Sequence, residues 1–208
     1  NGTERVCQRI GGTADNQGGH ANHSENVYRM GVNLGGLATV LPALAGTPLR
    51  SGAHAGQTWE WYIQQMTDQL GYQQIDGGCS EGGWIYDDRN GAEGCSVSDG
   101  STSQWAYIGL ESAEIAGGPY GVFVNNRHKY RIASNLINNQ RAVDGGAGYR
   151  SSSRIGDLKL TGGALVGARW LGVHQFQRGD DTVAFPNRSP YTRDRLRQSY
   201  DDYVGFLA

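Results

Sequence analysis

Two short stretches decide the fold. "EGGWIY" occupies positions 81–86, and the related "DGGAGY" occupies positions 144–149, which is 63 positions later. A second related pair follows in the same order, with "SQWAYIGL" at 103–110 and "TGGALVGA" at 161–168. Two patterns that return in one order predict an internal repeat, and the second copy has the shorter loop between its patterns.

The segments around these stretches have the apolar spacing of amphipathic helices. They are residues 27–44, 58–73, 101–117, 127–140, 158–176 and 189–208. Pro42 is expected to end or kink the first helix, and Thr58 to cap the second. Ser101, Thr102 or Ser103 is expected to cap the third. The sequence therefore predicts an all-α chain with a Gly-rich irregular arm at 1–26 and a repeat domain at 27–208.

The order of helix, acidic-Gly-Gly-x-x-Tyr turn and capped helix resembles the prenyltransferase and squalene-cyclase repeat. The matching positions are Gly82, Gly83, Trp84, Tyr86, Ser103 and Trp105, then Gln140, Asp144, Gly145, Gly146, Tyr149 and Thr161. The resemblance covers residues 30–205 and implies a curved array of helical hairpins, with inner and outer helices alternating as in an α/α toroid. A closed toroid needs about five to seven hairpins and this chain supplies about three, so the array is partial.

The paired glycines are predicted to be structural. A tight reversal between an outer and an inner helix needs positive φ angles and close backbone approach, which glycine allows. The aromatic residues are predicted to cover the turn and to stack on the neighbouring unit. The predicted turn residues are Gly82, Gly83, Trp84, Tyr86, Gly145, Gly146 and Tyr149.

The residues that carry chemistry in enzymes with this repeat are not reproduced here. Cyclases of this kind use an aspartate cluster, whereas Asp87 and Asp88 lie in a turn. The prenyltransferases hold zinc with an Asp-x-Cys pair, whereas Cys95 and Asp99 are four positions apart. The sequence therefore assigns no catalytic residue and no cofactor.

Two patterns are weak candidates for metal sites. Residues 87–94 resemble half of a calcium loop, but position 97 is Val where the full loop needs Glu. Two histidines three positions apart lie in the N-terminal arm, and imidazole pairs bind transition metals. The candidate ligands are Asp88, Asn90 and Glu93 for calcium, and His20 and His23 for a transition metal.

Composition limits the partners and the location. The formal net charge of −2 gives no basic field for a nucleic acid. No apolar run approaches the roughly 18 residues that span a membrane. Cys79 and Cys95 bracket one loop and are predicted to form a disulfide, which leaves Cys7 free or paired with another chain. The chain starts at Asn1 like a processed chain or a fragment, and an extracellular or cell-surface location is expected.

A partial array exposes apolar ends, which usually find partners. The sequence therefore predicts a secreted or cell-surface structural or interaction module that forms homo-oligomers or polymers, as rings or filaments. The predicted contact residues are Leu34, Leu37, Leu41, Leu196, Tyr200, Tyr203 and Cys7. Two alternatives remain open. One is a fragment or half of a terpene-cyclase-like or prenyltransferase-like enzyme, and the other is a glycan- or peptide-binding module that uses Trp84, Tyr86 and Tyr149. The sequence identifies no small-molecule ligand.

Overall fold

The computed structural model describes residues 26–75, 77–86, 98–150, 153–179 and 191–208. Within these ranges the chain has no β-strand, so the predicted all-α class is confirmed. The α-helices are α2 (Val27–Leu44), α3 (Trp59–Tyr72), α4 (Gly100–Gly117), α5 (Asn126–Asn139), α6 (Leu158–Trp170) and α7 (Arg193–Leu207). Three short 3-10 helices accompany them: η1 (Gly78–Ser80), η2 (Gly118–Tyr120) and η3 (Val173–Gln175).

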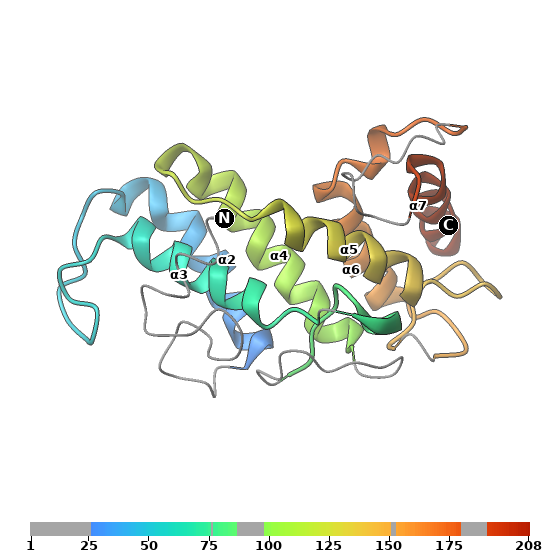
Figure 1. Ribbon diagram of the computed structural model, residues 1–208, viewed down its shortest axis with the longest axis horizontal. Helices are drawn as coiled ribbons and strands as arrows, with labels where there is room; N and C mark the ends of the chain where they lie inside the picture. Colours follow the sequence, from blue (N-terminus) through green and yellow to red (C-terminus); the bar gives the residue numbers. More distant parts are fainter. Residues whose placement is uncertain (1–25, 76, 87–97, 151–152, 180–190) are drawn as a thin grey trace.

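The helices form two layers. In the first layer α2 packs on α4, and α4 packs on α6. In the second layer α3, α5 and α7 follow one another, and side chains link them. The Gln64 side chain pairs with both the N–H (2.9 Å) and the carbonyl (3.1 Å) of Phe123, which precedes α5, and the Tyr203 hydroxyl donates to the Leu136 carbonyl. Successive hairpins therefore lie along the longest axis of the molecule, from α2 and α3 at one end to α7 at the other (Figure 1).

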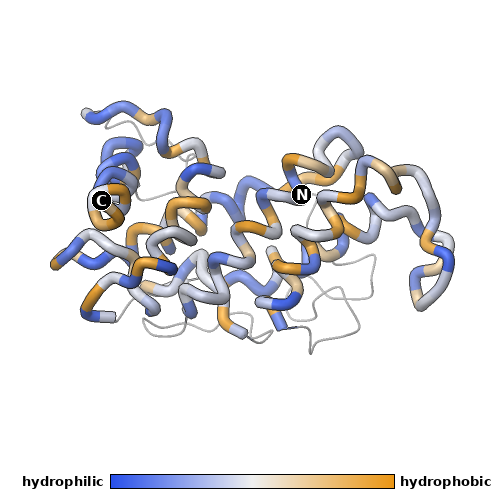
Figure 2. The backbone as a smooth tube through the Cα atoms, turned by 180° about the vertical axis from the view of Figure 1, so that it is seen from behind, coloured by the Kyte–Doolittle hydropathy of each residue, from blue (hydrophilic) through white to orange (hydrophobic). Residues whose placement is uncertain are grey.

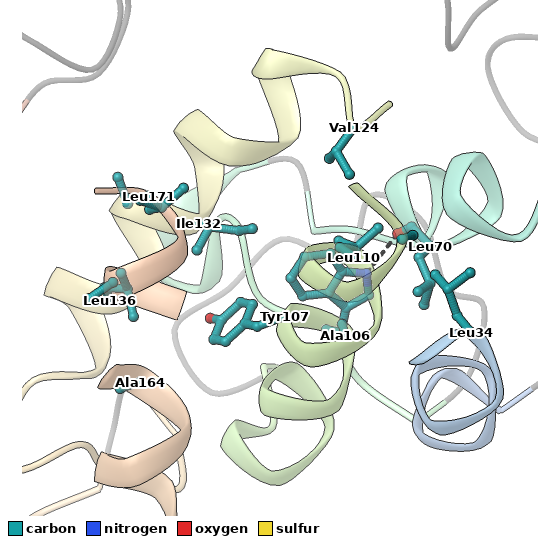
Figure 3. Close-up of a cluster of buried hydrophobic side chains, with 14 of the residues drawn as sticks. Leu34, Leu70, Ala106, Tyr107, Leu110, Val124, Ile132, Leu136, Ala164 and Leu171 are labelled. Atoms are coloured by element: carbon teal, nitrogen blue, oxygen red, sulfur yellow. Dashed lines mark hydrogen bonds between the residues drawn. The ribbon is translucent and has the colours of Figure 1, made fainter. Parts of the chain in front are cut away.

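The hydrophobic core lies between the layers, with α4 at its centre. Ala106, Tyr107 and Leu110 of α4 are buried between Leu34 and Leu70 on one side and residues of α5 and α6 on the other (Figure 3). Along each helix hydrophobic residues alternate with hydrophilic ones (Figure 2), as expected when only one face is buried.

Glycine sets the spacing between α2 and α4. A Cβ at Gly31 would lie 2.3 Å from the Trp105 carbonyl oxygen, and one at Gly109 would lie 2.6 Å from the Gly31 carbonyl oxygen. Since real Cβ atoms do not approach so closely, the two backbones can touch only because both positions lack a side chain. The small-residue face of α4 is thus a helix-packing surface.

The helix ends confirm the predicted cap of α3, correct the predicted cap of α4 and overturn one of the two alternatives for Pro42, an end of the helix at that residue. Thr58 caps α3 by accepting from the Trp61 N–H at 3.4 Å, as predicted. The cap of α4 is Asp99 and not Ser101, Thr102 or Ser103, because its carboxylate accepts two N–H groups and also favours the positive end of the helix. Pro42 does not end α2, which continues to Leu44. A missing N–H costs little there, since the helix has only two further residues.

The two glycine turns have the same backbone geometry. We call residues 74–84 the first corner and residues 140–147 the second corner. Gly82 and Gly145 have φ values of 81° and 78°, in the left-handed region that favours glycine. The Gly82 N–H donates to the Ile75 carbonyl at 2.9 Å, and the Gly145 N–H donates to the Arg141 carbonyl at 2.8 Å.

A hydroxyl from the following helix ties each corner down. The Trp84 N–H donates to Ser103 Oγ at 2.9 Å, and the Ala147 N–H donates to Thr161 Oγ1 at 2.9 Å. Each hydroxyl belongs to the fourth residue of its helix, inside the first turn. The role of Ser103 and Thr161 is therefore to hold the preceding corner, and not to cap the helix.

A glutamine side chain joins each corner to the next helix of the second layer. Gln74 Nε2 donates to the His128 carbonyl of α5 at 3.1 Å, and Gln140 Nε2 donates to the Ser199 carbonyl of α7 at 3.1 Å. Equivalent glutamines thus make equivalent contacts in the two corners, as expected of a true structural repeat.

His128 is buried at the first of these junctions. Its Nδ1 lies 3.1 Å from Gln74 Oε1, and its ring occupies the space that a side chain at Gly71 would need. Burial lowers the pKa of His128 to about 3, and the positive charges of Arg131 and Arg127 add to the shift. The imidazole is therefore neutral in the folded protein at any pH well above 3, and its Nδ1–H can donate to Gln74.

This burial predicts a loss of stability in mild acid. Between pH 3 and 6.5 the unfolded chain binds a proton at His128 that the folded chain does not bind, so stability falls as the pH falls through this window. Lowering the pH from 7.5 to 5.0 should lower the free energy of unfolding by about 2 kcal/mol through this group alone. Urea denaturation at both pH values measures the loss, and His128→Asn, which keeps a donor at the Nδ1 position, should remove that part of it. An equal pH dependence in the two proteins would contradict the assignment.

Candidate functional site

Two exposed tyrosines meet at the start of α4. The side chains of Tyr86 and Tyr149 are 45% and 43% exposed. The Tyr86 hydroxyl lies 3.3 Å from Ser101 Oγ, which itself donates to the Asp99 carboxylate. The pKa of Tyr149 is raised to about 12, first by its hydrogen bond to Asp99 and then by burial. Both hydroxyls therefore converge on Asp99 and Ser101.

An aromatic pair extends this surface toward α2. The ring of Tyr28 lies parallel to that of Tyr86, with 6.2 Å between the centroids and 8° between the planes. Tyr28 also contacts Trp105 of α4 at 5.3 Å. We call Tyr28, Tyr86, Trp105 and Tyr149 the tyrosine cluster. Four separate segments of the chain build it, and Tyr86 stacks on a neighbouring element as the sequence predicts.

Trp84 does not belong to this surface. It is fully buried, its Nε1–H donates to the Leu70 carbonyl at 2.7 Å, and its ring meets Tyr107 edge to face at 5.8 Å. The proposal that Trp84 binds a glycan or peptide is therefore wrong, because no ligand can reach a ring enclosed by α3 and α4. Trp84 is a core residue.

The two end helices of the first layer expose aliphatic residues. On α2, Val40 is 46% exposed and a Cβ at Gly36 would meet no atom within 4 Å. On α6, Leu158 is 64% exposed and a Cβ at Gly162 would likewise meet no atom within 4 Å. Helical spacing places these residues on the sides of α2 and α6 that do not pack against α4. We define the α2 flank as Asn33, Gly36 and Val40, and the α6 flank as Leu158, Gly162 and Leu165.

The predicted contact residues lie elsewhere. Leu34, Leu41, Leu196 and Tyr203 are buried within the chain, Leu37 and Tyr200 are half-buried, and Cys7 lies outside the described residues. The expectation that α7 keeps an uncovered apolar stripe is wrong for Leu196 and Tyr203, which α5 and α6 of the same chain cover, whereas Val204 on the same helix is exposed. The Tyr203 hydroxyl, for example, is bound to the backbone of α5.

The open face of the first layer carries one ionisable pair. Burial raises the pKa of the Glu111 carboxyl on α4, and the positive charge of Arg169 on α6 works against this shift. Ile108 and Ile115 lie three positions before and four positions after Glu111, so helical spacing places them on the same side of α4. Among the described residues no three histidine, cysteine or acidic side chains form a group that could hold a metal ion.

The metal candidates cannot be placed. Asp88, Asn90, Glu93, His20 and His23 all lie outside the described residues. Cys79 is disulfide-bonded, whereas Cys7 and Cys95 lie outside the described ranges, so the pairing of Cys79 with Cys95 stays a prediction. In the part of the chain that the structure describes, no helix has the length and apolar character needed to cross a membrane.

Comparison with protein-family models, with characterised proteins and with solved structures gives no match for this chain. Function must therefore be argued from the surfaces above. Sequence reasoning missed the flanks and predicted that Leu165 is buried, although Val40 lies outside the apolar stripe that it assigned to the core, and that was the available signal.

Proposed function

We propose that this chain is a helical-repeat interaction module of the α/α-toroid type whose copies associate end to end through the α2 flank and the α6 flank. One observation carries the proposal. The first and last helices of the first layer expose Val40 and Leu158 on their outward sides, whereas α4 between them is packed on both sides. Each flank lies where the next helix of a longer array would pack.

Association would continue the packing already present inside the chain. Helices of the first layer meet through positions without side chains, as Gly31 and Gly109 do. Gly36 on one flank and Gly162 on the other offer the same close approach. Val204 and Leu207 add exposed aliphatic surface on α7, the partner helix of α6, which helps to reach the roughly 1,000 Å² of a stable interface. Two different flanks make a heterologous contact, which closes into a ring or continues as a filament.

The equivalent corners support the toroid-type resemblance, because the same glycines, hydroxyls and glutamines make the same contacts in both units. The two cysteines Cys79 and Cys95, which bracket one loop, favour an oxidising compartment, and hence an extracellular or cell-surface location. A disulfide between Cys79 and Cys95 is part of this proposal.

A second candidate function is the binding of a glycan or an extended peptide at the tyrosine cluster. The observation that favours it is the exposure of Tyr86 and Tyr149, whose hydroxyls converge while their rings remain accessible. The third possibility, a fragment of a cyclase-like or prenyltransferase-like enzyme, would rely on the open face that holds Glu111 and Arg169.

The end-to-end contact predicts complementary assembly variants. Val40→Asp destroys the α2 flank, and Leu158→Asp destroys the α6 flank, since each buries a charge in an apolar contact. Each variant alone should sediment as a monomer while the native chain forms larger species. An equimolar mixture should give dimers and nothing larger, because one intact flank remains on each partner. Analytical ultracentrifugation measures all three samples, and circular dichroism checks that the variants fold.

The matched control is Ile115→Asp, which places the same charge at an exposed aliphatic position of α4. It lies on neither flank and should leave association unchanged. A native chain that stays monomeric at high concentration would refute end-to-end association and leave the tyrosine cluster as the leading site. An effect of Ile115→Asp equal to that of Val40→Asp would refute the assignment of the flanks.

A further inference from the structure

An open pocket of about 600 Å³ lies between the second corner and α7. The corner contributes Val143 and Asp144, and α7 contributes Asp202, Gly205 and Phe206. Val143 is 74% exposed although it is aliphatic, so this apolar side of the pocket is accessible to solvent. The pocket belongs to the second layer and involves neither flank.

In the first corner, the space that corresponds to this pocket lies between the corner and α5, and it is filled by the chain itself. Six residues separate Ile75 from Gly82, whereas only three separate Arg141 from Gly145. The longer segment contains η1, which packs against α5. Ser80 of η1 is fully buried, so η1 closes its junction with α5. The second corner lacks these three residues.

The contacts that each corner makes with its neighbouring helix show that the pocket on α7 corresponds to the space filled by η1 on α5. A Cβ at Gly82 would strike the carbonyl of Arg131 on α5, and the atom nearest to a Cβ at Gly145 is the carbonyl oxygen of Asp202 on α7. Gln74 and Gln140 make the matching hydrogen bonds one turn earlier on the same helices. The pocket therefore occupies on α7 the position that η1 occupies on α5.

Charge distinguishes the two places. Arg131 on α5 corresponds to Asp202 on α7, and the exposed Asp202 carboxylate accepts a hydrogen bond from Gln140 Nε2 at 3.4 Å. The other charged groups of the pocket are engaged, and they include Arg195, whose guanidinium donates to Gln140 Oε1 at 3.3 Å. Asp144 accepts from the N–H groups of Gly146 and Gly156, Asp201 pairs with Arg197 at 2.8 Å, and the Arg141 guanidinium donates to three backbone carbonyls. Asp202 thus places a carboxylate at the position of α7 that an arginine occupies in α5.

We propose that this pocket binds a glycine-containing turn of another polypeptide, in which a lysine or arginine pairs with Asp202. The shape follows from η1, whose Gly78 has a φ of 70°, so a glycine is needed to turn the chain in so short a segment. The charge follows from the exchange of Arg131 for Asp202. Exposed Val143 and the half-buried Phe206 provide the apolar contact on either side.

The probes are two peptides derived from residues 76–82, with serine in place of Cys79. One keeps the acidic residues of that segment, and the other has lysine at both acidic positions. Titration of the ¹⁵N-labelled chain, followed by amide chemical shifts, should show millimolar binding of the lysine peptide at Val143, Gly145, Asp202 and Phe206. The acidic peptide should bind at least about tenfold more weakly, and Asp202→Lys should reverse this preference.

A filled variant tests the shape separately from the charge. In it, Ala142 and Val143 are replaced by the lysine form of the five-residue segment 76–80, which restores the length of the first corner. This variant should keep the amide spectrum of the folded chain and lose peptide binding. Equal shifts with both peptides, unchanged binding to the filled variant, or no shift at millimolar peptide would each overturn the proposal.

Discussion

Gly82→Ala is expected to unfold the protein at room temperature, or to lower its free energy of unfolding by more than about 4 kcal/mol. A Cβ at this position would lie 1.6 Å from the carbonyl oxygen of Arg131 and 2.1 Å from its carbon. Both atoms belong to the backbone of α5, so relief requires the whole helix to move. The left-handed φ of 81° adds a further cost of about 1–2 kcal/mol for any residue with a Cβ.

Two other glycines separate the clash from the backbone strain. Gly172 has a φ of 75° and no atom within 4 Å of an added Cβ, so Gly172→Ala should cost only about 1–2 kcal/mol. Gly145→Ala should fall between, since its Cβ would meet the Asp202 carbonyl oxygen at 3.1 Å. Urea denaturation ranks the three variants. Equal costs for Gly82→Ala and Gly172→Ala would show that the corner does not dock on α5 as described.

This ranking refines what the sequence predicts. From the sequence, valine at Gly82 or Gly145 should be far more damaging than asparagine at Asp87 or Asp88, which lie outside the described residues. The structure shows that the two glycines are unequal, because the first corner lies closer to its helix.

Trp84→Ala is expected to lower the free energy of unfolding by about 3–5 kcal/mol. The indole is the largest fully buried side chain, and it fills the space between the corner, Leu70 and Tyr107. Trp84→Phe should retain part of the packing but leave the Leu70 carbonyl without this donor. The urea denaturation midpoint at constant slope measures both losses.

Tyr86→Ala is the matched control, because it removes an aromatic ring only two positions after Trp84, just beyond the first corner. That ring is partly exposed, so the expected cost is below about 1 kcal/mol. Similar losses for Trp84→Ala and Tyr86→Ala would contradict the division between a core tryptophan and a surface tyrosine.

The sequence predicts the helices and corners well for a physical reason. Paired glycines and the spacing of apolar residues are local signals, and they act within one turn or one helix. The cap of α4 was misassigned because Ser101 and Asp99 are both good cap residues, and only the three-dimensional backbone shows which carboxylate or hydroxyl faces the free N–H groups. The burial of Leu196 and Tyr203 depends on how α5 and α6 sit against α7, which no local pattern contains.

The candidate sites were harder to predict, although one signal was available. Aligning Gln74 with Gln140 exposes the three-residue difference between the corners and hence the pocket on α7. The tyrosine cluster brings Tyr86 and Tyr149 together at Ser101 and stacks Tyr28 on Tyr86, and no local pattern predicts these contacts between separate segments.

The glutamine junctions have a consequence for how such a chain can change in evolution. Gln74 Nε2 and Gln140 Nε2 each donate to a backbone carbonyl, which is present whatever side chain the neighbouring helix carries, and each Oε1 accepts from a donor side chain there, the imidazole of His128 or the hydroxyl of Ser199. His128 and Ser199, which differ in size and chemistry, are therefore accepted at the same junction. A gene duplication that adds one corner with its two helices would also add the glutamine that bonds this corner to the next helix of the second layer. The number of units can then grow or shrink between generations without a compensating mutation at this junction.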